Sequence, residues 1–111
     1  MRGIFGNLQA FDQLHVLLAP NEAGVYILWK VSGPKPEPFY VGRSRVSMRG
    51  RLLQHWLGTG SRKIAATRKN ELAFECQAMI SVEQVEAILI KELPTYPVGN
   101  LRRETDPADR W

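Results

Sequence analysis

Two short apolar runs separated by a proline-rich segment limit what this chain can fold into more than any other feature. Residues 25–31 (VYILWKV) and 39–42 (FYVG) are rich in β-branched and aromatic side chains. The intervening residues 32–38 (SGPKPEP) contain three prolines and a glycine. β-Branched and aromatic residues favour strands, whereas Pro and Gly mark turns and loops. The sequence therefore predicts two strands joined by a loop, most simply an antiparallel hairpin.

Periodic apolar residues on both sides of this hairpin predict further elements. Residues 4–18 and 48–57 carry apolar side chains at helical spacing, and Pro20 and Gly58 follow them as breakers. Residues 62–70 are basic and fit either a loop or a short helix. Residues 71–80 alternate, with one apolar side made of Leu72, Phe74, Cys76, Ala78 and Ile80, as in a strand.

A last helix is predicted over residues 81–93, ending before Pro94. Ser81 fits its N-cap, with Gln84 completing a capping box, and Ile80 and Val85 fit a hydrophobic staple. The order helix, hairpin, helix, strand, helix indicates an α+β fold: a small three-stranded, mainly antiparallel sheet flanked by helices. The 111 residues suit one domain, with an N-terminal helix within 1–20, a core over about 22–101 and a polar tail over 102–111.

Composition excludes several classes of protein. A hydrophobic content of 44% with 23% charged residues argues against a disordered chain. The single cysteine, Cys76, excludes a disulfide framework and an all-cysteine zinc site, and we expect it to pack on the apolar side of its strand. No apolar run reaches the roughly 18 residues of a membrane span, and the polar N-terminus does not resemble a secretory signal. We therefore expect a cytoplasmic protein without membrane contact.

The positive charge is concentrated in one part of the chain. Residues 43–69 contain eight basic side chains and no acidic one, in a protein of net charge +4. They are Arg43, Arg45, Arg49, Arg51, Arg62, Lys63, Arg68 and Lys69. Such a stretch is typical of a surface that faces phosphates. A solvated basic loop with its acids elsewhere in the fold is an equal alternative.

Glu86 is the clearest anomaly in the sequence. On a helical wheel it lies inside the apolar face formed by Val82, Val85, Leu89, Ile90 and Leu93. A carboxylate in an apolar setting costs free energy unless it is paired, protonated or bound to a metal. The sequence leaves two interpretations open: a metal ligand, or a buried carboxylate satisfied by an arginine.

Other candidate residues are weaker when taken singly. Arg51 and His55 are four residues apart and share one side of their helix, where two solvated polar groups would be the ordinary interpretation. Tyr26 and Tyr40 lie in the two strands of the hairpin, where tyrosines often only pack. Gly42, after the second strand, would let a backbone or a phosphate approach closely.

Taken together and in order, these residues resemble the GIY-YIG nuclease superfamily. Gly24-Val25-Tyr26 and Tyr40-Val41-Gly42 are similar to the two tripeptides that name the family, with Val in place of Ile. Arg51-x-x-x-His55 resembles its Arg-x-x-x-His helix, Glu86 its metal-binding glutamate and Asn100 its closing asparagine. The matches span residues 24–100. The proline-containing loop is slightly longer than usual, Glu83 offers a competing register for the glutamate, and we expect no extra DNA-recognition domain of the kind that many family members carry.

The resemblance implies a metal-dependent endonuclease that hydrolyses phosphodiester bonds in nucleic acid, with DNA the expected substrate. Tyr26 or Tyr40 would take the proton from water, Arg51 would grip the phosphate, and His55 would relay a proton. Glu86 would hold Mg²⁺ or Mn²⁺, since hard cations prefer carboxylate oxygen. The expected nucleic-acid contacts are Arg43, Ser44, Arg45, Arg49, Arg62, Lys63 and Asn100. The residues do not decide which tyrosine is the base.

Two alternatives remain open at this point. One is a catalytically silent nucleic-acid binder on the same fold, which would use the basic stretch 43–69. The other is a protein-interaction module whose basic stretch meets an acidic partner. The enzyme itself would act alone, as a dimer or beside a separate recognition subunit.

Overall fold

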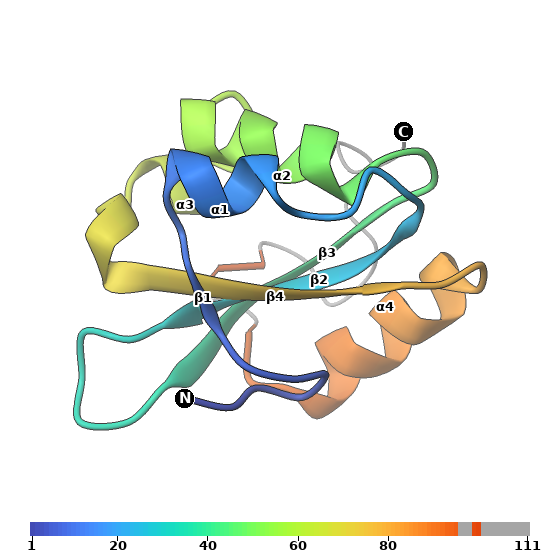
Figure 1. The fold of residues 1–111 in the computed structure, drawn as a ribbon. Coiled ribbons are helices and arrows are strands. Elements are labelled where there is room, and N and C mark those ends of the chain that lie inside the picture. The colour runs from blue at the N-terminus through green and yellow to red at the C-terminus, as the bar shows by residue number, and fades with distance from the viewer. Residues whose placement is uncertain (96–98, 101–111) are drawn as a thin grey trace.

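The structure is a computed structural model that describes residues 1–95 and 99–100. It is an α+β fold in which a four-stranded antiparallel sheet has the strand order β1-β4-β2-β3 (Figure 1). The hairpin predicted from the two apolar runs is confirmed as β2 (Gly24–Lys30) and β3 (Glu37–Ser44), which pair antiparallel. Their register places Tyr26 opposite Gly42 and Leu28 opposite Tyr40, with an irregularity between Leu28 and Trp29.

The sheet gains its third strand from the alternating segment. β4 (Leu72–Ala78) pairs antiparallel with β2 and sets Tyr26 opposite Cys76. One side of β4 joins the core as predicted, but Ile80 lies beyond the strand and is 96% exposed. The alternation therefore ended two residues earlier than the sequence suggested.

The N-terminal region differs from the prediction. Residues 4–18 do not form one helix: they contain the short strand β1 (Gln9–Ala10), paired with β4, and the five-residue helix α1 (Gln13–Leu17). β1 makes the sheet four-stranded instead of three-stranded. The reason is a long-range contact, because the carboxylate of Glu75 accepts the backbone N–H groups of Ile4, Phe5 and Gly6 at 2.6–3.1 Å. In a helix over these residues, the three N–H groups would not all point at the Glu75 carboxylate.

The helices form two layers on opposite faces of the sheet. α1, α2 (Met48–Leu57) and α3 (Arg62–Ala65) cover one face, and α4 (Val82–Glu92) covers the other (Figure 1). Two core clusters follow from this arrangement. Tyr26, Leu28 and Tyr40 pack with α2, whereas their neighbours in the strands, such as Val25 and Val41, pack with α4. Alternation along β2 and β3 therefore assigns each side chain to a layer.

The ends of the two longer helices are set by different means. α2 has the predicted limits: the hydroxyl oxygen of Ser47 accepts the N–H of Gly50, and Gly58, at φ +83°, ends the helix in the left-handed conformation that glycine adopts without strain. α4 begins after Ser81 as predicted, but the Ser81 side chain makes no capping hydrogen bond. The predicted capping box and the staple through exposed Ile80 are therefore wrong.

Residues 62–70, predicted as a loop or a short helix, contain a short helix and a turn. α3 is followed by the 3-10 turn η1 (Lys69–Glu71), which leads into β4. The predicted polar tail, residues 102–111, lies outside the described residues. Within the described part of the chain, no helix combines the length and apolar character needed to cross a membrane.

Candidate functional site

Three aromatic side chains from three different elements meet beneath α2. The Tyr26 hydroxyl on β2 and Nε2 of His55 on α2 lie 2.8 Å apart. Tyr40 on β3 stacks on Tyr26 at 6.4 Å between ring centroids and meets the His55 ring edge-on at 5.1 Å. All three side chains are at most 1% exposed. The register of the hairpin, which the sequence could not fix, thus places both tyrosines on the same face.

The hydrogen bonds of His55 define its protonation. The backbone N–H of Ser61 lies 3.3 Å from Nδ1 and donates to it. Burial, and then the positive charge of Arg51, lower the pKa of His55 from 6.5 to about 3. The ring is therefore neutral near pH 7, and with Nδ1 acting as acceptor its proton sits on Nε2. His55 consequently donates its hydrogen bond to the Tyr26 oxygen.

Gly42 makes this packing possible. A Cβ atom at this position would collide with the ring and hydroxyl of Tyr26, which lies directly across the strand pair. The close approach predicted at Gly42 is thus made by an aromatic side chain of the same protein. In the structure this glycine makes room for the tyrosine–histidine pair.

Arg51 lies in the same layer, one helical turn before His55. Its side chain is 3% exposed, and Nη1 donates to Oε1 of Gln54 at 2.6 Å. The ordinary interpretation of Arg51 and His55 as two solvated polar residues is wrong, because both are buried. The structure brings Tyr26, Tyr40, Arg51 and His55 together.

Glu86 lies in the other layer. The wheel placed it correctly in the apolar face of α4, and it is fully buried. Nε of Arg43 donates to its Oε1 at 3.0 Å, and Arg43 is itself 2% exposed. Arg43 follows Val41 by two residues on β3, so both face α4, whereas Tyr40 and Gly42 face α2. Glu86 and the tyrosine–histidine cluster therefore lie on opposite faces of one edge strand.

Of the two interpretations of Glu86, the structure contains the geometry of the carboxylate paired with an arginine. The donor chemistry also suits Mg²⁺, which is often bound by one or two carboxylates together with water and substrate phosphates. The described residues contain no group of three His, Cys, Asp or Glu that could hold a metal ion. A metal at Glu86 would compete with the guanidinium of Arg43.

The residues expected to contact nucleic acid are placed very differently from one another. Arg45 is exposed and forms an ion pair with Glu83, the competing glutamate. Nε of Arg49 donates to the carbonyl of Ala19 at 2.8 Å. Ser44 is buried, and its hydroxyl oxygen accepts the N–H groups of Val46 and Ser47, which shapes the turn before α2. Arg62 and Lys63, on α3, are exposed.

Asn100 is engaged with the backbone of the protein. Its Oδ1 accepts the N–H of Val41 at 2.9 Å, and its Nδ2 donates to the carbonyl of Val41 at 3.0 Å. The side chain is 3% exposed. Asn100 is thus fastened to β3 beside Tyr40, and any orienting effect on the site would act through this strand. An exposed contact to DNA does not fit this burial.

Glu75 is the polar residue that sequence reasoning missed. It occupies the polar side of the alternating strand, yet it is 3% exposed and also accepts the indole N–H of Trp29 at 2.7 Å. Gly3 was the available signal, because a Cβ at this position would collide with the Glu75 carboxylate. This carboxylate fastens the N-terminal residues to the sheet.

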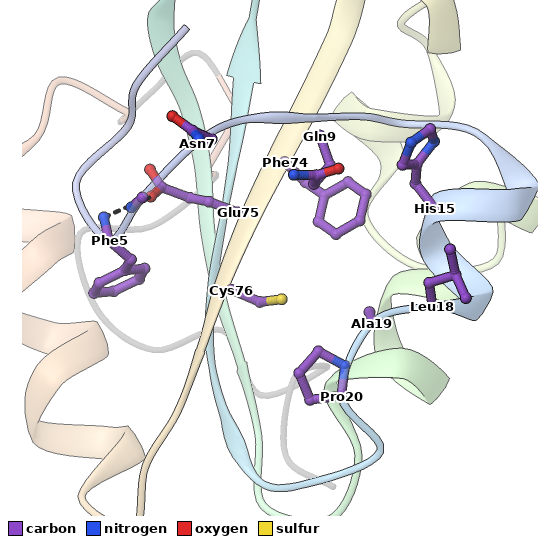
Figure 2. Close-up of a pocket in the computed structure, with 11 residues that line it drawn as sticks. Phe5, Asn7, Gln9, His15, Leu18, Ala19, Pro20, Phe74, Glu75 and Cys76 are labelled. Carbon is purple, nitrogen blue, oxygen red and sulfur yellow. Dashed lines mark hydrogen bonds between the residues drawn. The ribbon is translucent and has the colours of Figure 1, made fainter.

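A separate cavity of about 290 Å³ lies between the N-terminal residues, α1 and β4 (Figure 2). Phe5, His15, Leu18, Phe74 and Cys76 are among its lining residues, and no residue of the tyrosine–histidine cluster is. Burial, followed by the charge of Glu75, raises the pKa of the Cys76 thiol to about 11. The thiol is therefore protonated at neutral pH, which agrees with the packing function expected for it.

Comparison with protein-family models, curated proteins and solved structures yields no match. The likeness to the GIY-YIG superfamily therefore stays a prediction from the motifs.

Proposed function

We propose that this chain is a metal-dependent endonuclease that hydrolyses phosphodiester bonds in nucleic acid, with DNA as its substrate. The observation that carries the proposal is the contact between the Tyr26 hydroxyl and Nε2 of His55 at 2.8 Å. A neutral histidine that donates to a phenol oxygen favours the deprotonated phenol. The pair is therefore suited to taking a proton, as a tyrosine in ordinary surroundings is not.

The hydrogen bond favours Tyr26 over Tyr40 as the general base. Tyr26 would act as the phenolate, whose negative charge the Nε2–H of His55 stabilises, and it would become the neutral phenol when it takes a proton from the attacking water. The positive charge of Arg51, close enough to act on His55, acts in the same direction. Because Tyr26 is fully buried, water and phosphate must reach it through a rearrangement of the groups above it.

Arg51 is the residue proposed to bind the scissile phosphate. A guanidinium can hold two phosphate oxygens at once, which an ammonium group cannot do. In the structure its Nη1 donates to the neutral amide oxygen of Gln54, and a charged phosphate oxygen is a stronger acceptor for such a donor. Glu86, on the other face of the edge strand β3, would hold Mg²⁺ or Mn²⁺, and the metal would supply Lewis-acid stabilisation of the developing negative charge to a substrate that spans this edge of the sheet.

The test is cleavage of a mixed panel: supercoiled plasmid, single-stranded, branched and flapped DNA, and RNA. Each substrate is incubated with Mg²⁺, Mn²⁺ or EDTA, with the natural protein, Tyr26→Phe and Glu86→Ala in parallel. Cutting that needs the metal and is lost in both variants, while circular dichroism shows that both are folded, supports the proposal. Cutting by Glu86→Ala at the natural rate would show that Glu86 is not part of the active site. Cutting in EDTA would show that the reaction does not need a metal.

One observation favours a second candidate, a nucleic-acid binder without catalysis. Glu86 is fully buried and its Oε1 is occupied by Arg43, as in a structural ion pair. In a binder, Glu86→Ala would leave nucleic-acid affinity unchanged or higher, and no protein in the panel would cut. Binding of every substrate with no cleavage under any condition would therefore select this second candidate.

A further inference from the structure

The eight basic residues of segment 43–69 fall into two sets in the structure. Two are neutralised by carboxylates on α4: Arg43 by Glu86 and Arg45 by Glu83. Two more are engaged by neutral oxygens, because Arg49 donates to the carbonyl of Ala19 and Arg51 donates to Gln54. Half of the basic run is therefore already committed to contacts within the protein.

The second set lies on α3 and η1. Arg62, Lys63, Arg68 and Lys69 are all exposed, and among the described residues none of them forms a salt bridge. We call these four side chains the α3–η1 surface. Residues 43–70 contain no Asp or Glu, so no acid within this segment offsets them. Four exposed cations close in the chain, with no salt bridge to any residue that the structure describes, attract a polyanion.

Contacts with the core and with α2 hold the α3–η1 surface in place, although α3 and η1 are both short. Ile64 of α3 is 2% exposed and belongs to the core beneath α2. The ammonium group of Lys69 lies 5.2 Å from the centroid of the half-buried Trp56 ring on α2, within cation–π range. An aromatic ring beside cations is also the arrangement on which exposed bases stack.

The same segment is tied to the candidate site. Gly58 ends α2, and three residues later the backbone N–H of Ser61 donates to Nδ1 of His55. α3 begins at the next residue, Arg62. α3 and η1 follow α2 in the same layer of the fold (Figure 1). The chain that carries the cations is thus bonded to the ring that donates to Tyr26.

We infer that the α3–η1 surface is where this protein holds the phosphate backbone of nucleic acid, next to the Tyr26–His55 pair. The inference rests on the proposed function for its substrate class and adds the location. It also removes Arg43, Arg45 and Asn100 from the expected nucleic-acid contacts, since internal partners occupy them. Arg68 and Lys69, which the resemblance did not select, are added.

The experiment is binding of fluorescently labelled duplex DNA in EDTA, measured by anisotropy between 50 and 200 mM salt. The quadruple variant Arg62→Gln, Lys63→Gln, Arg68→Gln, Lys69→Gln is compared with the natural protein. The matched control, Arg2→Gln, Lys30→Gln, Lys35→Gln, Lys91→Gln, removes the same charge from exposed positions elsewhere. Circular dichroism confirms that both variants are folded, and polyglutamate serves as a competing protein-like polyanion.

Each lost phosphate contact lowers the slope of log K against log[salt] by about 0.9, so four contacts correspond to about 3.6. Over this fourfold change in salt, the natural protein should then lose about 150-fold more affinity than the quadruple variant. The control should follow the natural protein. Equal effects of the two variants would overturn the inference, and so would competition by polyglutamate as strong as that by unlabelled DNA.

Failure of the proposed function gives a different result. If DNA binding depends on the α3–η1 surface but no substrate is cut with metal, the surface stands and the nuclease proposal fails. If the quadruple variant cuts and binds as the natural protein does, the nuclease stands and the inferred surface is wrong.

Discussion

Arg43 and Glu86 form a buried ion pair that joins β3 to α4. Nε and Oε1 are 3.0 Å apart, and the two side chains are 2% and 0% exposed. Removing two charges from water costs several kcal/mol per ion, which their attraction offsets only when both partners are present. The pair therefore stabilises the contact of α4 with the sheet only when both residues are present. A metal at Glu86 would have to displace the Arg43 guanidinium.

The first prediction is that breaking this pair is costly, whereas replacing it is not. Arg43→Met or Glu86→Leu alone should lower the free energy of unfolding by about 3–5 kcal/mol, and the double variant should be close to the natural protein. Urea denaturation measures all three. The matched control is Arg45→Met, since the Arg45–Glu83 pair is about half exposed and should contribute at most about 1 kcal/mol. Additive losses in the double variant would contradict the prediction.

The second prediction concerns stability and pH. The pKa of His55 is lowered from 6.5 to about 3 by burial and by Arg51. Below pH 6.5 the unfolded chain gains a proton at this ring that the folded protein refuses, so the free energy of unfolding should fall from pH 6.5 towards pH 3. Above pH 6.5 the full contribution is present.

Urea midpoints at pH 7 and pH 4.5 test this dependence. His55→Gln should lose several kcal/mol less between the two pH values than the natural protein does. His15→Gln is the control, because that ring is partly exposed beside Asp12. The same loss in His55→Gln and in the natural protein would show that His55 does not titrate as its burial requires.

The third prediction separates the two tyrosines. Tyr26→Phe removes the oxygen to which His55 donates, so it should destabilise the protein by about 1–3 kcal/mol. If Tyr26 is the general base, cleavage should also slow by at least about 10²-fold with DNA affinity unchanged. Single-turnover rates and anisotropy measure the two effects. Loss of cleavage in Tyr40→Phe, with Tyr26→Phe still active, would reverse the assignment.

The fourth prediction concerns the N-terminal residues. The Glu75 carboxylate accepts four N–H groups, from Ile4, Phe5, Gly6 and the Trp29 indole. Hydrogen bonds to a charged group contribute about 1.5–3 kcal/mol each, so Glu75→Ala should lose several kcal/mol of stability. Amide exchange at residues 4–6 should accelerate, whereas exposed Glu92→Ala should leave it unchanged. Unaltered protection of these amides in Glu75→Ala would exclude the carboxylate as their anchor.

Local patterns predicted most elements of the fold. The limits of α2 agree with the apolar period of 48–57, and the hairpin follows from two strand-forming runs around prolines. These signals lie within single segments, where propensity and burial agree. The prediction of one helix over residues 4–18 was wrong. Their apolar spacing suits a helix, but a carboxylate about 70 residues away in sequence accepts hydrogen bonds from their backbone.

The candidate site was predicted only in part, because its contacts join different segments of the chain. The wheel located Glu86 as buried, but its partner Arg43 comes from another element and appeared in sequence as one of eight similar cations. Tyr26, Tyr40 and His55 meet only because the register of β2 and β3 aligns them, which a sequence does not reveal. Which cations remain available likewise depends on the contacts that folding creates.

The amide of Asn100 has a consequence for the behaviour of the protein at high concentration. β3 is an outer strand of the sheet, and an outer strand with unpaired backbone groups is a template on which other chains can add. Asn100 pairs with both the N–H and the carbonyl of Val41, as a neighbouring strand would. Asn100 thereby occupies two backbone groups to which another chain could add, so Asn100→Leu should favour edge-to-edge association.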